Sequence, residues 1–137
     1  DIYLGQNKLD DAEQSIVSRQ RIVPENRAVS YKLAEVYIRQ NKYSEAERLV
    51  NRFVRKNDRE ISGWLLLQQA ANLDRDNPMR TVNVLRHRAE VQYWSGDEDN
   101  AIRSLIHAQR LAKGNNAMSA KVELRLKQMQ DERKLKI

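Results

Sequence analysis

The sequence predicts an all-α fold, a solenoid of about seven stacked, paired helices with an irregular C-terminal part. Three observations favour it. Only 4 Gly and 2 Pro interrupt 137 residues, in a chain rich in strong helix formers. The letters QNKLDDAE at 6–13 return as QNKYSEAE at 40–47, and this period of about 34 residues is typical of a repeated helix pair. Apolar residues recur every three or four positions, which is the spacing of helices with one buried face.

The first half of the chain is expected to form helices over 8–21, 27–40 and 43–56. Asn41 lies at the turn between the last two helices, where Asn tolerates a left-handed backbone. Ala46 is predicted to be small because two helices cross closely there. Each repeat is therefore a helix, a short turn and a second helix.

The second half departs from this period. Its predicted helices span 61–73, 79–95, 98–112 and 117–134. Gly96 takes the turn position of Asn41, but it comes earlier in the chain than two full periods after Asn41 would place it. The shortfall is the length of one helix, so the unit that begins at 61 either lacks its second helix or uses 79–95 for two purposes.

Polar residues mark the starts of two of these helices. Ser44 with Glu47 predicts a capping box on the helix of 43–56. The acids of GDEDN at 96–100 lack the ligand spacing of a calcium-binding loop. They are predicted to cap the helix of 98–112 and to offset its dipole.

The whole of 1–137 is predicted to be one domain. Its repeat pairs cover about 1–26, 27–60, 61–74 (partial) and an irregular 79–113, followed by a terminal capping helix at 117–135. No apolar run is long enough for a transmembrane segment. The chain begins with Asp1 inside a helical pattern, and we expect it to be part of a longer protein.

The repeat resembles the tetratricopeptide repeat, whose signature is W-x2-L-G-x2-Y, then A-x3-F, then P. In residues 27–60 the matching positions are Ser30, Leu33, Ala34, Tyr37, Ala46 and Val50. Trp64 and Leu67 open a third copy in phase. The resemblance implies a concave groove, lined by the first helix of each pair, that binds a segment of a partner protein.

Groove candidates lie on the faces turned away from the repeat signature. On the first helices of two pairs these are Tyr31, Glu35, Arg39, Leu65, Gln69 and Asn72. A second patch is predicted where the repeat phase breaks, formed by Arg86, Arg88 and Gln92. The alternative for an apolar candidate such as Leu65 is that it only packs against a neighbouring helix.

No pattern in these residues predicts catalysis or a metal site. There is no Cys and no Gly-rich phosphate loop. His87 and His107 belong to different predicted helices and lie off the apolar face of each, so both are expected on the surface. The net charge of +6 comes from basic residues mixed with acids along nearly every helix, and we expect no nucleic-acid partner and no cofactor.

A narrower resemblance covers the second half. GWLLLQQA (63–70), RAEVQYWSGDEDNAIRSL (88–105) and SAKVELRLKQMQDERK (119–134) are similar to the C-terminal repeat region of periplasmic zinc metalloproteases of the β-barrel assembly-enhancing protease type. In that family a zinc protease domain with H-E-x-x-H precedes the repeats. No such motif occurs here, so no catalytic or zinc-binding residue is transferred.

This second resemblance implies a location and partners. It implies the periplasm, and contact with the outer-membrane assembly machinery or with unfolded substrate proteins in a chaperone-like role. Zinc would then belong to an upstream domain. The alternative is a free-standing repeat scaffold or assembly factor that has no protease domain.

Overall fold

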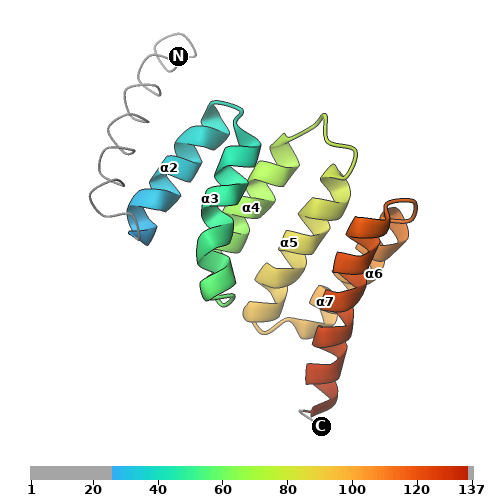
Figure 1. The fold of residues 1–137 in the computed structure, drawn as a ribbon. Coiled ribbons are helices and arrows are strands. Elements are labelled where there is room, and N and C mark those ends of the chain that lie inside the picture. The colour runs from blue at the N-terminus through green and yellow to red at the C-terminus, as the bar shows by residue number, and fades with distance from the viewer. Residues whose placement is uncertain (1–25, 136–137) are drawn as a thin grey trace.

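The computed structural model describes residues 26–135, which form six helices and no strand (Figure 1). The helices are α2 (Arg27–Arg39), α3 (Tyr43–Lys56), α4 (Ile61–Leu73), α5 (Arg80–Trp94), α6 (Glu98–Leu111) and α7 (Asn116–Leu135). These bounds match the predicted ones to within one residue at either end. The predicted helix at 8–21 lies outside the described residues. The all-α helix-pair solenoid is confirmed.

The helices follow one another from α2 to α6, and α7 turns back in front of α6 (Figure 1). Each helix packs against the next, and α2 also contacts α4. A single helix, α5, stands between α4 and α6 and packs extensively against both. We interpret α5 as the second helix of one pair and the first helix of the next, which is the second of the two alternatives for residues 79–95.

Two apolar cores hold the row together. The first core, formed by α2, α3 and α4, contains Leu33, Ala34, Ile38, Ala46, Leu49, Val50, Val54, Leu67 and Ala70. The second core, formed by α5, α6 and α7, contains Val82, Leu85, Ala89, Tyr93, Ala101, Ile102, Leu105, Ala108, Ala112, Val122, Leu126 and Met129. The change from one core to the other falls between α4 and α5, where the repeat phase breaks.

The turns after α2 and α5 are equivalent despite that break. Asn41 has a φ of 62° and Gly96 a φ of 91°. In the first turn the Lys42 amide donates to the Tyr37 carbonyl over 2.8 Å, and in the second the Asp97 amide donates to the Gln92 carbonyl, also over 2.8 Å. This pattern is the usual end of a helix with a left-handed residue just after it, and it confirms the predicted role of Asn41.

Of the two predicted helix caps, the one on α6 is confirmed and the one on α3 is wrong. The Asp97 side chain accepts from the backbone amide of Asn100, so this acid caps α6, and Glu98 and Asp99 lie in the first turn of the helix. The capping box of Ser44 is wrong: α3 begins at Tyr43, and its N-cap Lys42 makes no side-chain cap. The left-handed turn leads directly into α3, which places Ser44 inside the helix.

One close approach fixes the packing of α4. A Cβ on Gly63 would lie 2.6 Å from the Tyr31 hydroxyl of α2 and 2.6 Å from Val54 Cγ1 of α3. Gly at this position lets α4 come near both helices.

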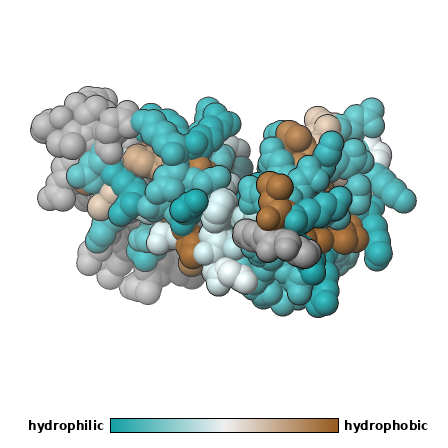
Figure 2. Space-filling view, turned by 90° about the horizontal axis from the view of Figure 1, so that it is seen from below, coloured by the Kyte–Doolittle hydropathy of each residue, from teal (hydrophilic) through white to brown (hydrophobic). Residues whose placement is uncertain are grey.

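The visible surface is mostly hydrophilic, with apolar residues in small separate patches (Figure 2). Of the helices in residues 26–135, none combines the length and the apolarity that crossing a membrane requires.

Candidate functional site: a charged cleft over the shared helix

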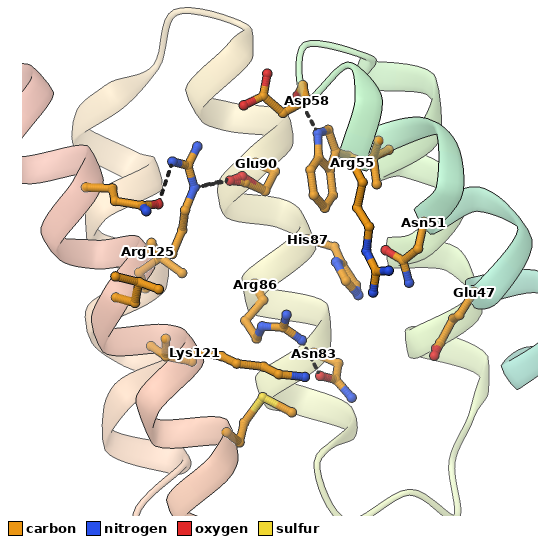
Figure 3. A pocket seen from close by; sticks show the side chains of 17 residues that line it. Glu47, Asn51, Arg55, Asp58, Asn83, Arg86, His87, Glu90, Lys121 and Arg125 are labelled. Atoms are coloured by element: carbon orange, nitrogen blue, oxygen red, sulfur yellow. Dashed lines mark hydrogen bonds and ion pairs between the residues drawn. The ribbon is translucent and has the colours of Figure 1, made fainter.

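A cleft of about 870 Å³ opens between α3 and α7, with α5 between them (Figure 3). Its wall on the α3 side is Glu47, Asn51, Val54, Arg55 and Asp58; the α5 residues are Asn83, Arg86, His87 and Glu90; and the α7 residues include Lys121, Arg125 and Gln128. Trp64 of α4 and Leu105 of α6 also line it. The space-filling view shows a hollow between the two halves of the molecule (Figure 2). The cleft thus lies where the repeat phase breaks.

An ion pair closes one end of the cleft and joins α5 to α7. Arg125 Nε donates to both carboxylate oxygens of Glu90, and its Nη1 donates to Gln128 Oε1 over 3.3 Å. Glu90 is only 6% exposed. Burial raises the pKa of its carboxyl group, while the bond from Arg125 lowers it. Arg125 therefore offsets part of the effect of burial on this carboxyl group.

Arg86 lies in the middle of the cleft and is half-buried. Its Nη1 donates to Asn83 Oδ1 over 2.9 Å. Burial lowers the pKa of its guanidinium, and the charges of Glu90 and Glu47 oppose that change. Arg remains charged in proteins, so the cleft holds a partly desolvated cation.

His87 lies on α5 next to Arg86, and its predicted surface position is wrong. It is 7% exposed and stacks on the Trp64 ring, with 6.1 Å between the ring centroids. Burial and the neighbouring Arg86 lower its pKa to about 3, so it is neutral at physiological pH. The physical reason is that α5 is buried on two sides, which encloses a position that a helix in a regular repeat would expose. His107 is exposed, as predicted.

Of the sequence-predicted site residues, Arg86 alone lines this cleft. Tyr31 packs edge-on against Phe53, with ring centroids 5.7 Å apart, and its hydroxyl is buried and finds no hydrogen-bond partner among residues 26–135. Gln92 accepts from the Ser104 hydroxyl over 2.8 Å and joins α5 to α6. The remaining candidates are exposed and lie elsewhere: Glu35, Arg39, Leu65, Gln69, Asn72 and Arg88. A groove formed by them stays a prediction.

Sequence reasoning missed the basic residues from the outer walls of the cleft. Arg55 comes from α3, whereas Lys121 and Arg125 come from α7. One signal was present: Lys121, Arg125 and Gln128 recur at helical spacing and so share a polar face of α7. Nothing in the sequence indicated that this face turns toward α3.

In residues 26–135 no group of three His, Cys, Asp or Glu side chains is arranged to hold a metal ion. The lining chemistry of the cleft is instead that of polar recognition, because it combines guanidinium, ammonium, carboxylate and amide groups with one indole ring.

Comparison with known proteins identifies the repeat. The family model of the tetratricopeptide repeat matches residues 3–70. Residues 3–70 belong to the tetratricopeptide-repeat family. Residues 27–70 of the matched segment include α2, α3 and most of α4.

The chain is also similar to curated proteins called β-barrel assembly-enhancing protease. Those of Escherichia coli (strain K12), Shigella flexneri and Escherichia coli O157:H7 are each 30% identical to it over 131 residues. The similarity covers 94% of this chain and 26% of each relative. The chain spans about a quarter of the length of the curated relatives it matches, and the resemblance noted in its sequence is confirmed.

Proposed function

We propose that this chain is the C-terminal repeat region of a periplasmic zinc metalloprotease of outer-membrane protein quality control, and that it binds partner or substrate proteins. One observation carries the proposal. Similarity to proteins named as β-barrel assembly-enhancing proteases extends over 94% of the chain. In this proposal zinc and the catalytic residues belong to the rest of the protein, and these repeats bind the partner or substrate proteins.

The cleft between α3 and α7 supports the binding role. Its volume of about 870 Å³ is that of a pocket able to enclose several side chains. Trp64 and Val54 offer apolar surface beside Arg86 and Lys121. A polypeptide segment supplies both apolar side chains and hydrogen-bonding groups, so it suits such a lining.

Site-specific photocrosslinking in the full-length protein tests the binding role. A photoreactive residue is placed at Gln128, which lines the cleft, and a control at Lys127, which is exposed and does not line it. We expect covalent adducts with outer-membrane β-barrel proteins or their assembly machinery from position 128 and not from 127. Equal labelling from both positions, or none, would contradict the proposed binding surface.

The protease part of the proposal has a separate test. The full-length protein is expected to contain an H-E-x-x-H motif, to bind zinc, and to lose proteolysis of misassembled outer-membrane proteins when the Glu of that motif becomes Gln. A full-length protein without this motif would instead be a free-standing repeat scaffold or assembly factor.

A further inference from the structure

His87 is a buried side chain with unused hydrogen-bonding capacity. It is 7% exposed and lines the cleft from α5. No residue from 26 to 135 makes a hydrogen bond with either of its ring nitrogens, and neither nitrogen is sealed from solvent. Buried polar groups of folded proteins normally have a partner. The imidazole of His87 is therefore open to a hydrogen bond from a molecule in the cleft.

The neighbouring helices hold this imidazole in a fixed orientation. The Trp64 indole N–H donates to the Asp58 carbonyl over 2.7 Å, which anchors the indole ring. That ring stacks on His87 with an angle of 29° between the two planes. The His87 ring extends from α5 toward the α3 wall, where Asn51 and Arg55 project (Figure 3). Because the ring is already oriented, a ligand loses little affinity to the ordering of this side chain.

The charges around His87 determine which kind of group it binds. Burial and the charge of Arg86 lower its pKa to about 3, so at physiological pH the ring has one N–H and one lone pair. A nearby positive charge favours the tautomer that directs the lone pair, and not the N–H, toward it. Arg55, Arg86 and Lys121 all line the cleft. The nitrogen that faces the cleft is therefore an acceptor, and it takes an N–H or O–H group but no carboxylate.

We propose that His87 accepts a hydrogen bond from a main-chain N–H group of the polypeptide segment that the cleft binds. The inference rests on the proposed protein-binding function and specifies how the segment is recognised. Every residue except proline supplies a main-chain N–H. A contact to this group therefore suits a site that takes segments of different sequence, which unfolded substrate proteins provide.

Methylation of single amides in a bound peptide tests the contact. Random dodecapeptides displayed on phage are selected against the full-length protein, and the one that best competes with crosslinking from position Gln128 is synthesised. Each main-chain N–H of this parent peptide is then replaced in turn by an N-methyl group, which removes one donor. Calorimetry measures binding to the wild type and to His87→Phe, which keeps a ring against Trp64 but has no nitrogen. The matched control is His107→Phe, since His107 is exposed on α6 and does not line the cleft.

We expect His87→Phe to weaken binding of the parent peptide about tenfold, as loss of one hydrogen bond predicts, and His107→Phe to leave it unchanged. At one peptide position, N-methylation should weaken binding to the wild type by a similar factor and cause no further loss in His87→Phe. The melting temperature of His87→Phe should not fall, because the change removes a buried polar group without a partner. A purely structural His87 would instead lose stability on substitution. If His87→Phe does not fold, His87→Leu replaces it.

Nuclear magnetic resonance of the wild type gives a second readout that packing alone would not change. The imidazole nitrogen signals of His87 are identified by their absence from the His87 variant. The signal of the nitrogen that carries the lone pair should move when the parent peptide is added, because it becomes a hydrogen-bond acceptor. It should move less with the N-methylated peptide that lost affinity, and the signals of His107 should stay in place.

Three outcomes would overturn the contact to His87. These are unchanged peptide binding in the His87 variant, equal N-methylation losses in variant and wild type at every position, and a loss produced only by alanine at a Ser, Thr, Asn or Gln of the peptide. The last result would mean a side-chain donor. Crosslinks from Gln128 together with any of these results would leave protein binding intact and remove only the contact to His87. Absence of the crosslinks, or of any competing peptide, would remove the proposed function itself.

Discussion

The first and second cores differ in the interactions that hold their helices together. In α2 to α4, apolar side chains repeat in phase and Gly63 allows a close helix contact. In α5 to α7, only Val122, Leu126 and Met129 of α7 are buried, although the helix has 20 residues. Polar links supplement them: Glu90 with Arg125, Tyr93 with Glu132, and Asp99 with Arg133. The terminal helix α7 buries only a narrow apolar stripe, so ion pairs and hydrogen bonds contribute to holding it against α5 and α6.

The strongest test of this difference is Arg125→Met. It should lower the free energy of unfolding by about 2–4 kcal/mol at neutral pH, because it leaves Glu90 charged and buried without its partner. Chemical denaturation measures the loss. The double variant Arg125→Met with Glu90→Met should recover most of it, since no buried charge remains. A loss unchanged in the double variant would mean that packing, and not charge, ties α7 to α5.

The loss of stability in Arg125→Met should depend on pH. Burial raises the pKa of Glu90 above its usual 4.5, and removing Arg125 raises it further. The folded state then binds the proton more tightly than the unfolded chain. The penalty of Arg125→Met is therefore fully present above the raised pKa and should shrink as the pH falls toward 4.5. A penalty that grew on acidification would contradict this assignment of Glu90.

A smaller effect is expected from Ala→Leu at the equivalent crossings of the two regions. Ala46 is 1% exposed in the first core and Ala101 0% in the second, so either change should cost about 1–3 kcal/mol by overpacking. The exposed Ala120→Leu on α7 is the control. Unequal losses at Ala46 and Ala101 in thermal melts would show that the phase break alters the packing as well as the spacing.

Gly63→Ala should destabilise the first region by about 1 kcal/mol, because the clash of its new methyl group outweighs the gain in helix propensity. That methyl group meets the Tyr31 hydroxyl and Val54. Tyr31→Phe removes the hydroxyl, which has no hydrogen-bond partner within the described part of the chain, and should rescue most of the loss in the double variant. A double variant no more stable than Gly63→Ala alone would place the strain elsewhere.

The smallest expected effect tests whether the turn at Gly96 is equivalent to the turn at Asn41. Gly96→Ala should cost about 1 kcal/mol from the backbone alone, because a Cβ there meets nothing within 4 Å. Gly96→Asn should cost less, since Asn41 adopts the same left-handed conformation. Calorimetry of both variants checks the order. Equal costs would indicate that Asn has no advantage over Ala in the left-handed conformation at position 96.

Local features of the fold were predictable from the sequence, and those set by distant contacts were not. Asn41, Gly96 and Ala46 each have a local requirement, a left-handed turn or a close crossing, so pattern and spacing identified them. The position of His87 depends on α5 being enclosed by α4 and by the cleft walls, which no local pattern encodes. Within the cleft only Arg86 was predicted, because Arg55 and Lys121 belong to helices that face each other only after folding.

The double use of α5 has a consequence for how the molecule unfolds. In a regular solenoid each repeat meets only its neighbours, and terminal repeats can fray one at a time. Here the helix that completes one pair also begins the next, so neither half retains its full buried surface if α5 detaches. We therefore expect hydrogen exchange to show a single cooperative unit centred on α5, in which loosening of one end is transmitted to the other.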